Sequence, residues 1–351
     1  RPGAEGAVQN WPVDNAYSNK ELDDMLSSML MECSRIVVTL GTDLHVDSLV
    51  DKEIKSKSRN RQKFGLGPTS IVDPSRMINE LRLRKSPAEI EIMRYSAKIA
   101  AQAHIQAMAN TKPGIGEWQL EGIIEGLFKY CRSSGAAYPC IIGSGENATI
   151  LHYNVNNDVC DEGEVILIDA GCEYKGYASD ITRSWPVNGK FSEPQAEIYQ
   201  LVLDSQNAAI EECRVGNPYN APHHAARRVL AQGLIDLGVI TQSIDEALEE
   251  DGDLSKWYMH NTGHWLGIDV HDVGIYRPDD KPRLFEEGMV ITIEPGLYFG
   301  AWRTDVDCPK RYANIGIRIE DDVLITKDGP DILSIDCPKT IDNIETLVGS
   351  S

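Results

Sequence analysis

The sequence has 351 residues, of which 42% are hydrophobic, and its 54 Asp and Glu outnumber its 34 Lys and Arg, giving a formal net charge of −20. This acidity argues against binding to nucleic acid or to an anionic membrane surface, because both require clustered Lys and Arg. No apolar run approaches the roughly 18 residues needed to cross a bilayer. We therefore expect a globular chain of about two domains that binds neither nucleic acid nor membranes.

The eight cysteines form no CxxC pair, so the sequence predicts neither a disulfide scaffold nor a thiolate zinc site. Free thiols fit a reducing compartment, which we expect to be the cytoplasm, with the mitochondrial matrix as the alternative. The chain begins at Arg1 without Met and without an apolar signal segment, so we expect a processed or shortened chain.

The first part of the sequence resembles a piece of a small α/β domain. Ser18 and Glu21 match a capping box and predict the start of a helix. A buried strand is expected at Ile36–Leu40 and a helix at Asp43–Ser56, followed by a polar, basic and turn-rich segment at Lys55–Gly67.

A clearer helix start follows, where Ser86 provides a cap, Pro87 occupies the first helical position and Glu89 completes a capping box. We place the domain boundary just before it. This gives a partial N-terminal domain at residues 1–82 and a catalytic domain at residues 83–351.

The second domain mixes helices with hairpin strands, which is typical of an α+β fold rather than of a doubly wound sheet. Beyond the helix that starts at Pro87, helices are predicted at 119–131, 192–212 and 221–237, and strands at 165–169, 177–185, 290–294 and 315–325.

Two aspartates mark the first candidate site. The apolar segment Val165–Ile168 ends in Asp169, and Asp180 follows in a second strand-like segment. If the chain turns about the middle of Glu173–Gly176, the two aspartates oppose each other across an antiparallel ladder, with Cβ atoms roughly 5 Å apart. Such like charges repel, and a metal cation would turn the repulsion into binding. Two exposed turn aspartates remain the alternative.

Three further segments add donors. The segment His260–Asp272 holds three of the eight histidines. The apolar segment Met289–Ile293 ends in Glu294, and an alternating run places Arg318 and Glu320 on one strand face. Taken alone, that face could simply be solvated. Together, four carboxylates and one histidine form an oxygen-rich set that suits hard divalent cations, Mn²⁺ above all, and has room for two.

With these residues in place, the sequence resembles the pita-bread metallopeptidases, a family that includes methionine aminopeptidase, prolidase, creatinase and aminopeptidase P. The resemblance covers about residues 70–345 and is most specific for aminopeptidase P. The strings that carry it are KSPAEIEIMR, GSGENATILHY, IDAGCEYKGYASDITRSWPVNGKF, HWLGIDVHDVG, TIEPGLY and GIRIEDDV. It implies an α+β fold, with a pita-bread catalytic domain after a truncated N-terminal α/β domain.

The resemblance also implies two divalent metal ions. Asp169 would bind one of them through both oxygens, and Asp180 and Glu320 would bridge the pair. His264 and Glu294 would complete the other position. A hydroxide between the metals would attack the scissile carbonyl, and Glu294 would shuttle the proton.

Further residues are implied to act on the peptide. His152, His260 and His271 would hydrogen-bond the substrate or the tetrahedral intermediate. Arg318, Tyr298 and Tyr276 would support the ligands or line a proline pocket. The implied activity is hydrolysis of the first bond of peptides with proline at position 2, carried out by a homo-oligomer, either a dimer or a tetramer.

Rival interpretations remain. Prolidase shares the ligands but takes dipeptides, and a mitochondrial processing relative trims one residue from imported proteins. The rival from another class is a binding protein on the same fold that has lost its metals, and the intact ligand set argues against it. Creatinase-like chemistry fits the strings least.

Overall fold

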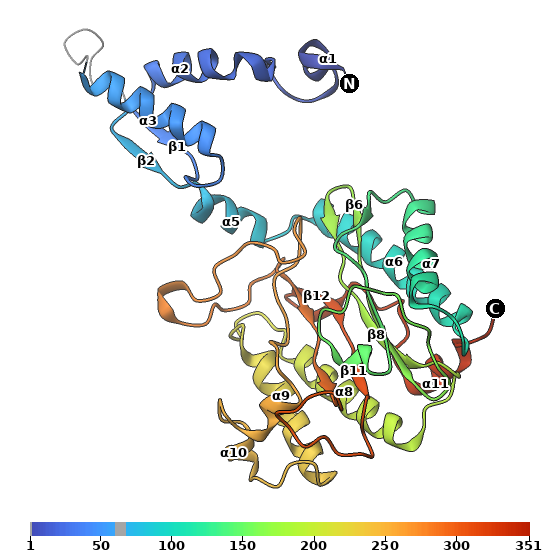
Figure 1. The fold of residues 1–351 in the computed structure, drawn as a ribbon. Coiled ribbons are helices and arrows are strands. Elements are labelled where there is room, and N and C mark those ends of the chain that lie inside the picture. The colour runs from blue at the N-terminus through green and yellow to red at the C-terminus, as the bar shows by residue number, and fades with distance from the viewer. Residues whose placement is uncertain (1, 60–67) are drawn as a thin grey trace. The chain divides into compact units, whose positions relative to one another are not determined.

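The computed structural model describes residues 2–59 and 68–351. The chain divides into two compact units, Arg1–Asn79 and Glu80–Ser351. In Figure 1 the first unit is blue, and the second runs from cyan to red. The division falls inside helix α5 (Ser75–Leu83).

The first unit has a small core beneath a two-stranded parallel sheet. Its elements are α1 (Gly3–Asn10), the short turn η1 (Asn19–Glu21), α2 (Leu22–Glu32), β1 (Arg35–Val37), α3 (Leu44–Arg59) and β2 (Ser70–Val72). The capping box predicted at Ser18 is confirmed. Leu30, Ile36 and Val50 form the buried cluster.

Two predictions for this unit are wrong. The strand predicted at Ile36–Leu40 is the shorter β1, in which Ile36 alone is buried, because helices cover only one face of the sheet and burial therefore alternates along the strand. Residues 57–59, predicted to be turn-rich, are the end of α3, and residues 55–56, which both predictions covered, are helical. The rest of the predicted basic segment, residues 60–67, lies outside the described residues.

The second unit is built from small antiparallel sheets. Their strand orders are β4-β5-β8, β13-β12-β9, β10-β11 and β3-β6-β7. The strands are β3 (Gly135–Ala136), β4 (Ile141–Ser144), β5 (Val165–Asp169), β6 (Cys172–Tyr174), β7 (Tyr177–Ala178), β8 (Thr182–Pro186), β9 (Val290–Ile293), β10 (Gly296–Tyr298), β11 (Gly316–Arg318), β12 (Asp321–Thr326) and β13 (Gly329–Ile332).

Helices cover these sheets on two sides. The helices are α6 (Pro87–Asn110), α7 (Glu117–Tyr130), α8 (Glu193–Glu211), α9 (Ala221–Asp236), α10 (Ile244–Ala247) and α11 (Ile341–Leu347). Helix α6 packs against β6 and β7 and α7 against β4, whereas α8 packs against β9, β10, β11 and β13. In Figure 1 the central strands therefore lie between the α6–α7 pair and the α8–α9 pair.

Helix α6 starts as its sequence predicts. The Ser86 hydroxyl accepts a hydrogen bond from the Glu89 N–H, and the Glu89 carboxylate accepts one from the Ser86 N–H. The face buried against the sheets includes Met93, Ala97, Ala101 and Met108. The local cap and the apolar periodicity thus agree on where the helix lies.

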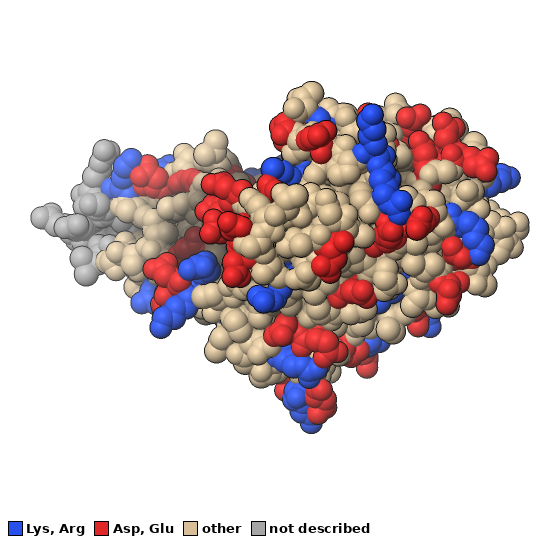
Figure 2. All heavy atoms as spheres, turned by 90° about the horizontal axis from the view of Figure 1, so that it is seen from below, with Lys and Arg blue, Asp and Glu red and all other residues tan. Residues whose placement is uncertain are grey.

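No helix in the described part of the chain is both long enough and apolar enough to span a membrane. On the face seen in Figure 2, Lys and Arg side chains are interspersed with Asp and Glu. This arrangement differs from the continuous basic patch that phosphate backbones require.

A buried histidine in α6 predicts a loss of stability in acid. His104 is fully buried, and its Nδ1 donates to the Ala100 carbonyl at 2.9 Å. Burial lowers the pKa of His104 from 6.5 to about 4. Between these two values only the unfolded chain takes up the proton, so the stabilisation is present above pH 6.5 and is lost as the pH falls toward 4.

We expect the free energy of unfolding of the wild type to fall by on the order of 3 kcal/mol more than that of His104→Gln over this pH range, as measured by urea titrations. A difference between the two proteins that does not change with pH would contradict this assignment.

Candidate metal centre and active site

The direct pairing predicted for Asp169 and Asp180 is wrong. Asp169, the last residue of β5, lies opposite Thr182 of β8. Asp180 precedes β8 by two positions, and residues at alternate positions share a face of a strand. The two aspartates therefore lie diagonally on one face instead of directly opposite each other.

The reason is the hairpin turn. Its two turn residues, Lys175 and Gly176, have φ angles of 51° and 82°, which is typical of a type I′ turn. Tyr174 consequently pairs with Tyr177 and is not part of the turn itself. The hairpin axis falls one residue later than predicted, so every opposing pair is displaced.

Asp169 and Asp180 nevertheless meet through Tyr138. The Tyr138 hydroxyl lies 2.5 Å from Oδ1 of Asp169 and also contacts Oδ1 of Asp180. Burial and the neighbouring carboxylates raise the pKa of Tyr138 well above its ordinary value, so the hydroxyl stays protonated. Sequence analysis missed this residue, because Tyr138 precedes β4, 31 positions before Asp169, and matches no recognisable pattern.

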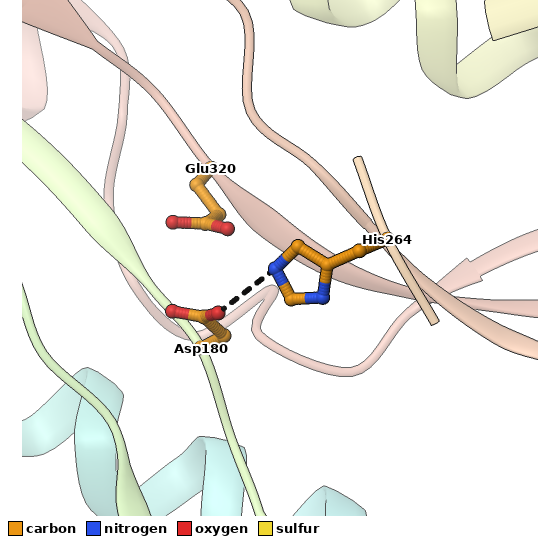
Figure 3. Close-up of side chains that lie close together, drawn as sticks. All are labelled: Asp180, His264 and Glu320. Atoms are coloured by element: carbon orange, nitrogen blue, oxygen red, sulfur yellow. Dashed lines mark ion pairs between the residues drawn. The ribbon is translucent and has the colours of Figure 1, made fainter. Parts of the chain in front are cut away.

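Three of the predicted metal ligands converge. Asp180, His264 and Glu320 each place a donor atom within 4.8 Å of the others. Figure 3 shows Nε2 of His264 directed at Asp180, whose Oδ2 is 3.4 Å away. Glu320 follows β11, and its Oε2 accepts a hydrogen bond of 2.6 Å from the Thr182 hydroxyl. The carboxylate is therefore fixed from β8.

The other two predicted ligands lie in the same cavity. Oε1 of Glu294 lies 3.5 Å from Nε2 of His264. Asp169 forms an ion pair with Arg318, with 2.7 Å between Oδ2 and Nη2. The cavity has a volume of about 680 Å³. Besides the five predicted ligands, it is lined by His152, His260, His271 and Arg318.

Tyr298 lies behind the cavity wall and connects two predicted residues. Nη1 of Arg318 donates to the Tyr298 hydroxyl at 3.0 Å, and this hydroxyl lies 2.8 Å from Nε2 of His260. Since Nδ1 of His260 contacts the Asn261 carbonyl at 2.8 Å, it carries the proton, and Nε2 accepts from Tyr298. Both ring nitrogens are thus engaged, and a substrate contact would require one of these bonds to open.

Tyr276 does not line this cavity. Its ring stacks on Trp265 with an interplanar angle of 8°, and its hydroxyl accepts the Trp265 N–H at 3.1 Å. It lines a second cavity of about 360 Å³, which shares Asn261, Gly263 and His264 with the first. Tyr276 lies two positions beyond the HWLGIDVHDVG string, and sequence spacing does not show which of the two cavities it lines.

The electrostatics of the cluster favour a bound cation. Burial and then the charge of Asp169 raise the pKa of Asp180, and burial and Asp180 raise the pKa of Glu320 well above its usual range. Burial also raises the pKa of Glu294 to about 7. These carboxylates repel one another, and protons or a divalent cation relieve the repulsion.

The histidine of the cluster fits the same interpretation. Burial alone would lower the pKa of His264, but the hydrogen bond and charge of Asp180, together with Glu294, raise it to about 9. A ligand imidazole must be neutral, so a cation bound there would replace that proton. Carboxylate oxygens with one imidazole form a donor set that suits a hard divalent metal.

The segment that carries His264 and His271 is closed by an ion pair. Nζ of Lys85 lies 3.1 Å from Oδ2 of Asp272, and each side chain is only 1% exposed. The Asp272 N–H also donates to the Trp265 carbonyl at 2.8 Å. The two histidine rings meet edge to face, with centroids 4.3 Å apart. The loop thus holds both imidazoles against the cavity.

With this geometry established, comparison with known proteins identifies the family. The model of metallopeptidase family M24 matches residues 91–327, more than half of the chain. The chain belongs to metallopeptidase family M24. The predicted peptidase family is therefore confirmed.

Members of family M24 resemble this chain over nearly its whole length. The Xaa-Pro aminopeptidase of Escherichia coli is 38% identical over 99% of this chain and 78% of its own length. That of Haemophilus influenzae is 41% identical over 99% of this chain and 77% of its own. Aminopeptidase PepP of Pseudomonas aeruginosa superposes with a TM-score of 0.94, at 39% identity, over 100% of this chain and 78% of that one. The predicted α+β fold of the M24 metallopeptidases is confirmed.

Removing one partner of the buried ion pair tests its contribution to the fold. In Asp272→Asn, Lys85 loses its anion while remaining buried, and Arg82 loses one of its two aspartate partners. We expect the free energy of unfolding to fall by about 3–5 kcal/mol in chemical denaturation.

The matched control is Asp331→Asn, which breaks the Arg94–Asp331 pair, whose side chains are 44% and 42% exposed. We expect this change to cost less than about 1 kcal/mol, since solvent screens such a pair. Equal losses in the two variants would show that burial of the Lys85–Asp272 pair has no special effect.

Proposed function

We propose that this chain is an Xaa-Pro aminopeptidase that uses two divalent cations to hydrolyse the N-terminal Xaa-Pro bond of peptides. The observation that carries the proposal is the convergence of Asp180, His264 and Glu320 in one cavity with Asp169 and Glu294. The Escherichia coli and Haemophilus influenzae relatives are named for this activity, which supports the substrate assignment.

We assign the ligands as follows. Asp180 and Glu320 would be shared by the two cations, Asp169 would hold one of them, and His264 and Glu294 would hold the other. When bound, the cations would polarise the scissile carbonyl and supply a hydroxide from water as the nucleophile. We propose Mn²⁺, because four of the five donors are carboxylates. A zinc-substituted form of the Escherichia coli enzyme is known with product, so zinc is the competitor to test.

The side chains of the cavity match the proton requirements of an Xaa-Pro bond. Its nitrogen has no hydrogen and leaves as a secondary amine, so it must gain a proton as the bond breaks. Glu294 lies in the cavity with its Oε1 3.5 Å from Nε2 of His264, which supports a role for this carboxyl group in accepting and returning that proton. His152 and His271 line the cavity, which supports a role for both as donors to the carbonyl oxygen.

The cavity also offers a reason for selecting proline at position 2. Ile141, Leu151 and Val270 provide apolar wall against which a compact ring can pack. The acidic cluster would attract the free α-amino group and so fix cleavage at the first bond. We expect these walls, rather than the buried Tyr298 or Tyr276 in the second cavity, to contact the proline ring.

The domain boundary before Leu83, the homo-oligomer and the cytoplasmic location remain predictions. Division of the chain into compact units near that residue supports the first of them. All eight cysteines are free, which supports a reducing compartment.

A comparison of three peptides tests the activity. We expect Arg-Pro-Pro to be cleaved faster than Arg-Ala-Ala and faster than the dipeptide Arg-Pro at equal concentration, with products followed by mass spectrometry. Faster cleavage of the dipeptide would move the assignment to a dipeptidase, the activity for which a human relative at 36% identity is named. Equal cleavage of Arg-Ala-Ala would remove the proline specificity.

A second experiment tests the cations. We expect a chelator to abolish turnover and Mn²⁺ to restore it. Asp180→Asn and Glu320→Gln should each lower both the Mn²⁺ content, measured by elemental analysis, and the rate, because a bridging carboxylate holds both ions.

His260→Ala is the control, and it should keep its metal while losing roughly 10²–10³-fold in rate. Wild-type metal content with near-normal turnover in Asp180→Asn would refute the ligand assignment.

A further inference from the structure

Glu117, the first residue of α7, is a completely buried carboxylate outside the cavity. Its Oε1 accepts hydrogen bonds from the Ser144 N–H at 2.9 Å and from Nδ2 of Asn147 at 3.1 Å. Its Oε2 accepts from the Tyr153 hydroxyl and from the Asp158 N–H, each at 2.9 Å. All four donors come from the chain between the end of β4 and the start of β5.

The four hydrogen bonds replace the water that the Glu117 carboxylate loses on burial. A buried carboxylate is unfavourable unless hydrogen bonds replace its water, and here each oxygen accepts two. The residue also stands at the N-terminus of a 14-residue helix, where unpaired N–H groups favour negative charge. The carboxylate therefore acts as a fixed anchor for the segment that surrounds it.

The anchored segment carries His152. This side chain lines the cavity next to the candidate metal ligands. After the short turn η2 (Asn147–Thr149), the segment has no helix or strand before β5. On such irregular backbone the ring keeps its position only as well as the backbone is held. Glu117 binds donors on both sides of the histidine, including the hydroxyl of the adjacent Tyr153.

We propose that Glu117 is a positioning residue for the peptidase reaction. It holds the segment 144–158 so that the His152 imidazole stays in place against the substrate, and it does so without touching the substrate itself. This role rests on the proposed function, since it requires His152 to contact the bound peptide. It extends the active site to a buried side chain on the first turn of α7.

The substitution Glu117→Gln tests the role while keeping the shape of the side chain. Each carboxylate oxygen accepts one backbone N–H, that of Ser144 or that of Asp158. An amide has one oxygen only, so whichever way it turns, one of these N–H groups faces a donor. We expect kcat/KM for Arg-Pro-Pro to fall by roughly tenfold to a hundredfold, as displaced catalytic groups do elsewhere.

A double-mutant cycle separates positioning from general damage. In a His152→Ala background, Glu117→Gln should change kcat/KM by less than about twofold, because the group that it positions is already gone. Glu197→Gln is the control. Glu197 lies on α8 outside the cavity, and its carboxylate accepts hydrogen bonds from Arg311 and Tyr312. It should leave kcat/KM unchanged. Thermal unfolding of each variant records any loss of stability separately.

Crystal structures of the wild type and Glu117→Gln, both with Mn²⁺, give a readout that needs no activity. We expect the segment 144–158 and the His152 ring to shift or to lose order, with α7 unchanged. Equal losses of kcat/KM with and without His152, or an unmoved His152 ring, would overturn the proposal. If the wild type does not cleave Xaa-Pro peptides, the proposed function fails, and the crystal structures still decide whether Glu117 holds His152.

Discussion

The structure depends on one electrostatic constraint, which is that four carboxylates are brought into a single buried place. Asp169, Asp180, Glu294 and Glu320 all line one cavity, and the pKa values of the last three are raised by burial and by other carboxylates of the cluster, Asp169 among them. Arg318 compensates Asp169, and His264 lies against Asp180. The remaining negative charge needs protons or cations, so a site that is costly for the empty protein becomes favourable when metals bind.

Asp169 ends strand β5, and Asp180, Glu294 and Glu320 lie within two residues of a strand end, so the hydrogen-bonded ladders leave these carboxylates little freedom to move away from their neighbours. Arg183, which is completely buried in β8, strengthens that frame. It donates to the Glu320 carbonyl at 2.5 Å and forms an ion pair of 2.8 Å with Asp321. The hydroxyl of Thr182, next to it in the chain, donates to the Glu320 side chain. Backbone and side chain of one ligand are thus fixed from the same strand, which is how a repulsive cluster keeps its geometry.

The two histidines proposed to contact the peptide lie on a different kind of backbone. His152 and His271 lie on irregular segments, and each segment is closed by a buried carboxylate that never enters the cavity. For His271 it is Asp272, paired with Lys85, and for His152 it is Glu117, bound by four donors. Carboxylates at strand ends and histidines on anchored loops together give a rigid cluster beside a wall whose shape loop sequences can alter.

Residue type and short-range pattern determined a large part of this protein. The capping boxes at Ser18 and Ser86, the apolar run into Asp169 and the family strings around the ligands depend only on near neighbours, and they could be predicted from the sequence. The hairpin register could not, because it follows from two positive φ angles at the turn. Only the tertiary structure placed Tyr138 between two aspartates and Tyr276 in a second cavity. Those contacts join different segments of the chain, and the number of residues between two segments does not determine how far apart they lie in space.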